Sequence, residues 1–267
     1  MKKISELMSL KERVAVITGG AGHIGAAMAE ALAELGANIV ILDISLESCL
    51  PVCERISKEY AVETLPLVID LVQEEHVRRV PDEVLNKFGR LDILVNCAAL
   101  GGTSKLQGWI TPFEEQSVDT WKGALDVNLT APFLLTQACT PALKKSGHGS
   151  VINVASIYGI LGPDMSLYEG TPMGNPAAYA ASKGGLLQLT RWLATVLAPD
   201  VRVNAITPGG VSRNQPEVFQ RRYIERTPLK RMAIEEDFKG AVAYLASDLS
   251  SYVTGQNIIV DGGWTAW

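Results

Sequence analysis

Short apolar runs that alternate with longer helical patterns are the feature that most constrains the fold of this chain. Near-continuous apolar character is typical of strands that are buried on both faces of a sheet. Runs of this kind predict strands at 14–18, 37–43, 64–70, 92–97, 150–156, 201–207 and 256–261. The segments between them predict helices at about 23–36, 46–59, 72–88, 114–146, 176–198 and 235–247. Pro81 is expected to kink or delay the helix in which it lies.

Strands that alternate with helices form right-handed crossovers and a parallel sheet. The sequence therefore predicts an α/β, Rossmann-type, doubly wound fold, with a seven-stranded, mostly parallel sheet and helices on both faces. No repeat or linker interrupts the pattern, so we expect residues 1–267 to form a single domain.

The bulk properties exclude several classes of protein. A formal net charge of −5 and the lack of a basic run argue against a nucleic-acid partner. No apolar run is long enough for a membrane span, and Glu6 and Lys11 interrupt any secretory signal core, so we expect a cytoplasmic protein. The 4 cysteines are expected to be reduced thiols, and scattered Cys and His residues predict no metal site.

A glycine-rich turn follows the first predicted strand. TGGAGHIG occupies residues 18–25, and Gly19, Gly22 and Gly25 are evenly spaced before a predicted helix. Glycine permits a tight turn and lets a phosphate approach the amides at a helix N-terminus. Because the loop has the required strand–turn–helix context, we predict that it binds a nucleotide.

Asp43 ends the second predicted strand, where a carboxylate can accept hydrogen bonds from the adenosine ribose hydroxyls. The same carboxylate would repel a 2′-phosphate. Ile44 follows Asp43, and the glycine loop has no arginine, so the sequence predicts NAD rather than NADP. Asp43 could instead cap the helix that begins near Leu46, although Ser45 could also do so.

Tyr179 and Lys183 lie four residues apart in a predicted helix and therefore face the same way. An ammonium beside a phenol favours the phenolate, so Lys183 is expected to lower the pKa of Tyr179. Such a phenol can act as a general acid or base on an alcohol or a carbonyl. A pair at this spacing also arises by chance, so its meaning depends on the rest of the chain.

Eight ordered segments together resemble the short-chain dehydrogenase/reductase family, over nearly the whole chain. They are TGGAGHIG, VID with Asp70, NCAA (96–99), LDVNL with Asn128, SVINVAS with Ser156, YAASK with Tyr179 and Lys183, TPGGVS (207–212) and YVTGQNIIVDGG (252–263).

The resemblance implies hydride transfer between a secondary alcohol and a nicotinamide cofactor. It makes Tyr179 the general acid or base, with Ser156 on the substrate oxygen. Lys183 would bind the nicotinamide ribose, and Asn128 would hold a water that links Lys183 to solvent. The cofactor contacts that it implies are Gly19, Gly22, His23, Ile24, Gly25, Asp43, Asp70, Leu71, Asn96, Ala98, Tyr179, Lys183, Pro208, Gly209 and Val211.

The chain departs from the family pattern in three places. His23 replaces a loop glycine, which is expected to tilt the loop without abolishing binding. Cys97 and Ala99 replace an asparagine and a glycine beside the cofactor. An insertion around 158–175 separates Ser156 from Tyr179. Tyr158 and Tyr168 in this insertion are rival phenols, but neither has a lysine four residues later.

The insertion and a loop at about 211–231 are expected to shape the substrate pocket. The loop carries Arg213, Arg221, Arg222, Arg226, Lys230 and Arg231. Arginine suits carboxylates and phosphates, so a polar, anionic, sugar-like substrate is one hypothesis. The alternative is a solvated helix face or a subunit contact. Hydroxyl groups could be read instead by Asp164, Glu169, Asn214 and Gln215. The segment YEGTPMGNPAAYAASKGG is similar to sugar-acid dehydrogenases and surface-sugar biosynthesis proteins.

Two other functions stay open. A sugar-modifying epimerase or dehydratase with retained NAD is favoured by the glycine spacing, but no sugar-nucleotide domain follows Gly263. A non-catalytic NAD-binding regulator is opposed by the four intact residues of the expected centre. Members of the family are usually homotetramers or homodimers, and the helices at about 114–146 and 176–198 resemble their contact surfaces.

Overall fold

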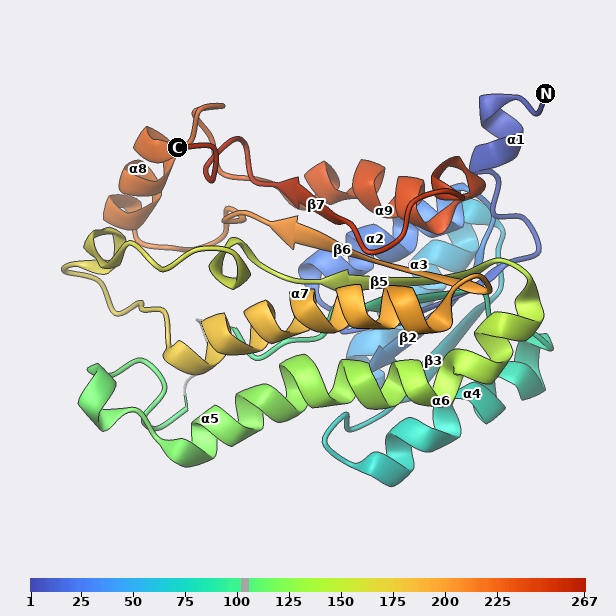
Figure 1. The fold of residues 1–267 in the computed structure, drawn as a ribbon, viewed down its shortest axis with the longest axis horizontal. Helices are drawn as coiled ribbons and strands as arrows, with labels where there is room; N and C mark the ends of the chain where they lie inside the picture. Colours follow the sequence, from blue (N-terminus) through green and yellow to red (C-terminus); the bar gives the residue numbers. More distant parts are fainter. Residues whose placement is uncertain (102–105) are drawn as a thin grey trace.

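Seven parallel strands form one sheet in this computed structural model, which describes residues 1–101 and 106–267. The strands are β1 (Val14–Thr18), β2 (Asn38–Asp43), β3 (Thr64–Val68), β4 (Ile93–Asn96), β5 (Gly149–Val154), β6 (Val201–Pro208) and β7 (Asn257–Val260). Their order is β3-β2-β1-β4-β5-β6-β7, and every neighbouring pair is parallel. The predicted doubly wound α/β fold is therefore confirmed (Figure 1).

Strand residues alternate between two apolar cores because successive side chains point to opposite faces of a sheet. In β1, Ala15 and Ile17 pack in one core, whereas Val14 and Val16 pack in the other. β2 repeats this pattern. Both faces are apolar, which explains why the strands appear as continuous apolar runs in the sequence.

The longer helices cover the two faces of the sheet (Figure 1). One face is covered by α2 (His23–Glu34), α3 (Leu46–Tyr60) and α9 (Lys239–Ala246). The other is covered by α4 (Glu74–Phe88), α6 (Ala131–Ser146) and α7 (Ala177–Leu197). The remaining α-helices are α1 (Ile4–Met8), α5 (Val118–Leu125) and α8 (Glu217–Arg226).

Two helical predictions were wrong in detail. α4 begins at Glu74 and runs through Pro81, so the proline does not delay the start of the helix. Proline removes one backbone hydrogen bond, but Val77, Val80 and Val84 on the same helix are buried, and this burial offsets the loss. The expected helix at about 114–146 is divided by a π-helical segment at Asp126–Thr130, which joins α5 to α6.

The carboxyl ends of the strands lie at one edge of the sheet, toward α8 (Figure 1). From β1 the chain winds outward to β2 and β3, and then returns past β1 to β4. Ligands of open α/β sheets bind outside the carboxyl ends at such a reversal of strand order. Most of the predicted site residues end or follow the strands β1 to β6, so they gather at this edge, whereas Asn128, Tyr179 and Lys183 lie in helical segments.

Two observations bear on other predictions. In the part of the chain that the structure describes, no helix combines the length and apolarity needed to cross a bilayer. Cys49, Cys53, Cys97 and Cys139 are free thiols.

Candidate active site

The glycine loop joins β1 to the N-terminus of α2. Gly19 has a φ of +62°, a conformation that side chains disfavour, and a Cβ there would lie 2.8 Å from the Ala98 Cα. A Cβ on Gly25 would overlap the Gly19 carbonyl oxygen. Gly22 is the N-cap of α2, with His23 and Ile24 next in the helix. The loop is therefore a close-packed cradle in front of a helix N-terminus, which suits a phosphate.

Asp43 reaches this cradle from the end of β2. Its Oδ2 accepts a hydrogen bond from the Ala21 amide at 3.2 Å, and its Oδ1 accepts one from the Ile44 amide at 2.8 Å. The carboxylate is thus held beside the glycine loop and not used as a helix cap, since α3 begins after Ser45. Asp70 lies in the turn after β3 and accepts a hydrogen bond from the Val72 amide at 3.1 Å.

The segment after β4 packs against the glycine loop through a residue that the sequence analysis did not identify. The Thr18 hydroxyl accepts hydrogen bonds from the amides of Cys97 and Ala98, at 3.0 and 3.1 Å. Leu71, Asn96 and Ala98 share one narrow crevice with Thr18. Thr18 therefore fixes the floor of the expected cofactor site.

The Asn96 side chain points into the core, so any cofactor contact it makes would come from its backbone. Its Nδ2 donates to the Asn153 Oδ1 at 2.8 Å and to the Thr136 hydroxyl at 3.4 Å. Asn153 in turn donates to the Thr190 hydroxyl at 2.8 Å. All four side chains are buried. This network ties β4 and β5 to α6 and α7 beneath the site.

Asn128 lies in the π-helical segment between α5 and α6 and is fully buried. Its Nδ2 donates to the Leu100 carbonyl at 3.1 Å and to the Ser182 hydroxyl at 3.0 Å, while its Oδ1 accepts from the Leu100 amide at 2.8 Å. The side chain thus joins the segment after β4 to α7. π-helical turns are frequent at functional sites. The expected water relay would have to form around a side chain that is already bonded to protein.

Ser156, Tyr179 and Lys183 lie together at the end of β5 and the start of α7. The short 3-10 helix after Ser156 packs so closely on α7 that a Cβ on Gly159 would lie 2.8 Å from the Lys183 backbone. The Ser156 hydroxyl lies beside the Tyr179 phenol. The Lys183 Nζ lies 5.9 Å from the centre of the Tyr179 ring and donates to the Val154 carbonyl at 2.7 Å.

Burial is the largest influence on the pKa values of Tyr179 and Lys183. It raises the pKa of Tyr179, with Ser156 opposing the change. Burial also lowers the pKa of Lys183 to about 8, while the nearby Cys97 opposes the change. The expectation that Lys183 lowers the pKa of Tyr179 is therefore not met in this structure, because the ammonium donates to a carbonyl and not to the phenol.

The segment after β6 is held by contacts with β7, α8 and the region before α9. Gly209 donates to the Val260 carbonyl at 2.9 Å, and Gly210 donates to the Tyr223 phenol oxygen at 2.6 Å. Val211 pairs with Ala233. The Arg213 Nε lies 3.6 Å from the Glu235 carboxylate, which also lies 3.5 Å from the His23 Nδ1. Pro208, Gly209 and Val211 thus lie at the end of β6 or directly after it, and Glu235 links Arg213 to His23 at the start of α2.

Most cations of the segment 211–231 have partners within the protein. Arg222 donates to the Glu169 carbonyl at 2.6 Å, and Arg226 pairs with Asp164. Arg213 pairs with Glu235, Arg231 pairs with Asp237, and Lys230 donates to the Glu225 carbonyl. Arg222 and Arg226 therefore hold the insertion against α8. This arrangement weakens the argument for an anionic substrate.

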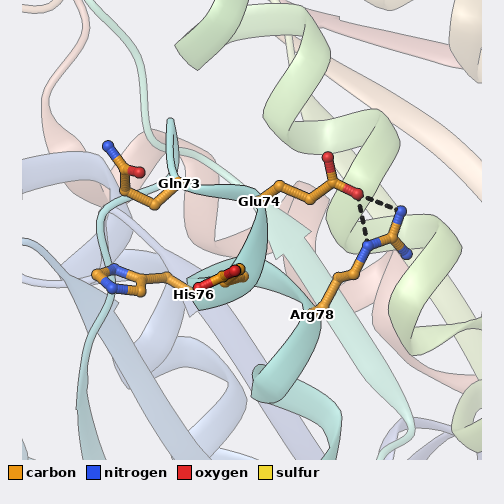
Figure 2. Close-up of a pocket in the computed structure, with 5 residues that line it drawn as sticks. Gln73, Glu74, His76 and Arg78 are labelled. Carbon is orange, nitrogen blue, oxygen red and sulfur yellow. Dashed lines mark hydrogen bonds and ion pairs between the residues drawn. The ribbon is translucent and has the colours of Figure 1, made fainter.

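A hollow of about 480 Å³ lies at the N-terminus of α4 and is lined by Gln73, Glu74, Glu75, His76 and Arg78. Figure 2 shows four of these side chains, those of Gln73, Glu74, His76 and Arg78. Arg78 pairs with Glu74 at 2.6 Å, and the lining comes from one short stretch of chain. None of the expected catalytic residues borders this hollow. Among the described residues, no group of three or more His, Cys, Asp or Glu could hold a metal ion.

Comparisons with known proteins agree with this geometry. The family model described as "Enoyl-(Acyl carrier protein) reductase" matches residues 19–265. A probable galactose dehydrogenase of Rhizobium meliloti is 35% identical over 97% of both chains. A trans-4-hydroxycyclohexanecarboxylate dehydrogenase of Sinomonas cyclohexanicum is 34% identical, over 100% of this chain and 97% of the relative.

Solved structures with similar folds hold both kinds of nicotinamide cofactor. A gluconate 5-dehydrogenase from Burkholderia cenocepacia, in complex with NADP and tartrate, has a TM-score of 0.87 at 30% identity, over 99% of this chain and 100% of that chain. A short chain dehydrogenase from Leptospira borgpetersenii with bound NAD+ has a TM-score of 0.83 at 33% identity, over 99% of this chain and 96% of that chain.

Proposed function

Because the chain belongs to the short-chain dehydrogenase/reductase family, we propose that it is an NAD-dependent enzyme that interconverts a secondary alcohol and a ketone by hydride transfer. The observation that carries the proposal is the convergence of Ser156, Tyr179 and Lys183 near Cys97, whose amide donates to Thr18 at the start of the glycine loop. The whole chain would act as one cofactor-binding unit, with a substrate loop at about 211–231.

Tyr179 would exchange the proton of the substrate. It would accept the hydroxyl proton during oxidation and return a proton to the carbonyl oxygen during reduction. Ser156 would hold the same oxygen by a hydrogen bond, which fixes the reacting carbon and stabilises developing negative charge. The high pKa of Tyr179 means that the phenol form dominates near neutral pH, which suits proton donation to a carbonyl.

Lys183 and Asn128 would support this transfer. Lys183 would bind the nicotinamide ribose, and its charge would stabilise a Tyr179 phenolate once it forms. Because the pKa of Lys183 is lowered to about 8, its amine is protonated and charged in most molecules at neutral pH. Asn128 would hold α7 in register with the segment after β4, through Ser182 and Leu100.

The residues present fit a nicotinamide dinucleotide. The glycine cradle before α2 leaves no room for side chains, so a diphosphate could approach the backbone amides. Asp43 would hold the adenosine ribose hydroxyls, and Asp70 with Leu71 would lie near the adenine. When bound, NAD+ would supply the nicotinamide ring that accepts the hydride.

NAD is preferred to NADP in this proposal. Among the residues that the structure describes, no arginine or lysine forms an ion pair with Asp43. An unneutralised carboxylate at this place would repel a 2′-phosphate. The exposed neighbour Ile44 cannot compensate that charge.

The substrate that we propose is a small, polar, ring-shaped alcohol of the sugar or sugar-derivative class. The relatives support this range of substrates, because their names include galactose and hydroxycyclohexanecarboxylate dehydrogenases.

The exposed apolar side chains of α5 and α7, including Trp121 and Trp192, would lie between subunits of a homotetramer or homodimer.

A substrate screen tests the proposed function. Sugars, sugar acids, cyclic alcohols, steroids and 3-oxoacyl thioesters would be assayed with NAD(H) and NADP(H) by absorbance at the nicotinamide band. We expect turnover with polar ring alcohols and NAD. Turnover restricted to steroids or acyl thioesters would reject the polar substrate. Tightly bound NAD that co-purifies without net NADH formation would support an epimerase or dehydratase instead.

A further inference from the structure

Two phenols and an amide of the insertion meet beside the expected proton donor. The hydroxyl oxygens of Tyr158 and Tyr168 lie 2.7 Å apart, and the Asn175 amide lies next to both. Tyr168 is close enough to Tyr179 to raise its pKa. Asn175 directly precedes Pro176, the N-cap of α7, and Tyr179 is in the first turn of that helix. One small molecule could therefore reach this group and Tyr179 together.

The side chains packed around these polar groups are apolar. The buried side chains of the same cluster are Ile157, Leu167, Tyr168, Phe219, Tyr223, Met232 and Trp264, with Tyr158, Leu161 and Met173 packed against them. The ring centres of Tyr168 and Phe219 are 5.4 Å apart, and those of Tyr223 and Trp264 are 5.6 Å apart. Where a ligand binds against apolar side chains, a few polar groups determine its orientation.

The hydrogen bonding among the side chains of Tyr158, Tyr168 and Asn175 is incomplete. Burial raises the pKa values of Tyr158 and Tyr168, so both remain protonated. One hydroxyl donates to the other, which leaves one O–H for a further acceptor. The Asn175 Oδ1 is buried and has no donor among the described residues. A buried polar atom without a partner is costly, which favours a ligand that supplies one.

One free O–H donor beside one free oxygen acceptor matches a hydroxyl group, which both accepts and donates a hydrogen bond. A carboxylate can only accept, so it would face the Asn175 Oδ1 without a proton. The nearest arginines of α8 do not alter this conclusion, because Arg222 and Arg226 are engaged with Glu169 and Asp164.

We propose that Tyr158, Tyr168 and Asn175 bind a second hydroxyl group of the substrate, so that the substrate is a neutral, ring-shaped diol or hydroxyketone. One oxygen of the substrate reacts at Ser156 and Tyr179. The other oxygen is held by Tyr158, Tyr168 and Asn175, which together form the phenol–amide group. This inference rests on the proposed hydride transfer, which it narrows to one class of substrate.

The test compares kcat/KM for matched six-membered ring alcohols with NAD. Cyclohexanol carries the reacting group alone, the 1,2-, 1,3- and 1,4-cyclohexanediols add a hydroxyl, and 4-hydroxycyclohexanecarboxylate adds a charge. For the wild type, we expect at least one diol isomer to exceed cyclohexanol by about tenfold, the scale of one net hydrogen bond. The hydroxy acid is expected to be no better than cyclohexanol.

Two variants assign that preference to the phenol–amide group. Tyr158→Phe removes one hydroxyl, and Asn175→Leu removes the amide at nearly constant volume. Both are expected to lower kcat/KM for the preferred diol more than for cyclohexanol, so that the ratio of the two falls from about ten to about one. Tyr252→Phe is the matched control, because Tyr252 is fully exposed. Melting temperature and NADH affinity verify that each variant is folded.

The outcomes separate this inference from the proposed function. Turnover of cyclohexanol without any diol preference, or a gain for the hydroxy acid, would overturn the inference and leave the proposed function standing. An equal loss for cyclohexanol and the diol in Tyr158→Phe would show that the phenols only hold the insertion, and would also overturn it. If the enzyme turns over none of these alcohols and none of the sugars of the screen, both the inference and the proposed function are rejected.

Discussion

Substitution of Gly25 by alanine is predicted to damage the cofactor cradle far more than the same change at Gly22. A Cβ on Gly25 would overlap the Gly19 carbonyl oxygen and come within 2.9 Å of the Gly19 carbonyl carbon. Both obstacles are backbone atoms, so the loop itself must move. Overpacking of this kind costs about 1–3 kcal/mol, and we expect the upper end because no flexible side chain can yield.

Gly22→Ala is the matched control in the same loop. Its φ of −81° suits alanine, and the new Cβ would lie 3.2 Å from the Gly19 oxygen, so a shift of a few tenths of an ångström suffices. We expect a change in unfolding free energy below about 1 kcal/mol, since the lost flexibility of the unfolded chain offsets part of the strain.

Thermal melting and NADH fluorescence titration measure the two effects. About 3 kcal/mol corresponds to a fall in melting temperature of roughly 6–12 °C for a chain of this size. Loss of one hydrogen bond to a charged phosphate would weaken NADH binding by about 10- to 100-fold in Gly25→Ala. Equal melting temperatures and equal NADH affinities for the two variants would refute the cradle geometry.

Three further outcomes follow from the site. Asp43→Asn removes the charge that opposes a 2′-phosphate, so the ratio of kcat/KM for NAD to that for NADP should fall by at least about tenfold; an unchanged ratio would contradict the assigned role. Asn153→Leu leaves the buried Asn96 amide without its 2.8 Å acceptor and should lower the unfolding free energy by about 1–3 kcal/mol in urea titrations, whereas no loss would show that the network is dispensable. Lys183 has a folded pKa of about 8, below the ordinary lysine value of 10.5, so the unfolded chain binds more protons between these pH values and stability rises with pH there. Relative to Lys183→Met, the wild type should gain about 2 kcal/mol between pH 8 and 9.5, and a flat difference would refute the burial argument.

The strands were predictable because the central ones are buried on both faces and each leaves a short apolar run in the sequence, although the edge strands β3 and β7 are only partly buried. β1 and α2 have the predicted starting residues, Val14 and His23. The π-helical segment at Asp126–Thr130 was not predictable, since one extra residue in a turn hardly alters the apolar pattern of a long helix. The five-residue helix α1 buries no side chain and leaves no apolar periodicity to detect.

The site was predictable to the extent that motifs identify which residues follow which strand. Parallel strands bring such residues to one edge whatever their separation in the sequence. Side-chain partners are different, because they depend on contacts between distant segments. The Lys183 bond to the Val154 carbonyl, the inward direction of Asn96, and the pairing of Arg226 with Asp164 are of this kind. Asn175 lay in the insertion that the sequence analysis singled out, but its buried oxygen could be found only in the folded chain.

The central claim is that the Tyr179 phenol exchanges the proton of the substrate, and turnover of Tyr179→Phe with the best alcohol of the screen tests it most directly. The substitution removes one oxygen and keeps the ring that packs near Trp109 and Ala178. We predict that kcat falls by at least about a hundredfold, the scale of a general acid–base contribution, while NADH affinity and melting temperature stay at wild-type values. Near-normal turnover in a folded, NADH-binding Tyr179→Phe protein would contradict the account.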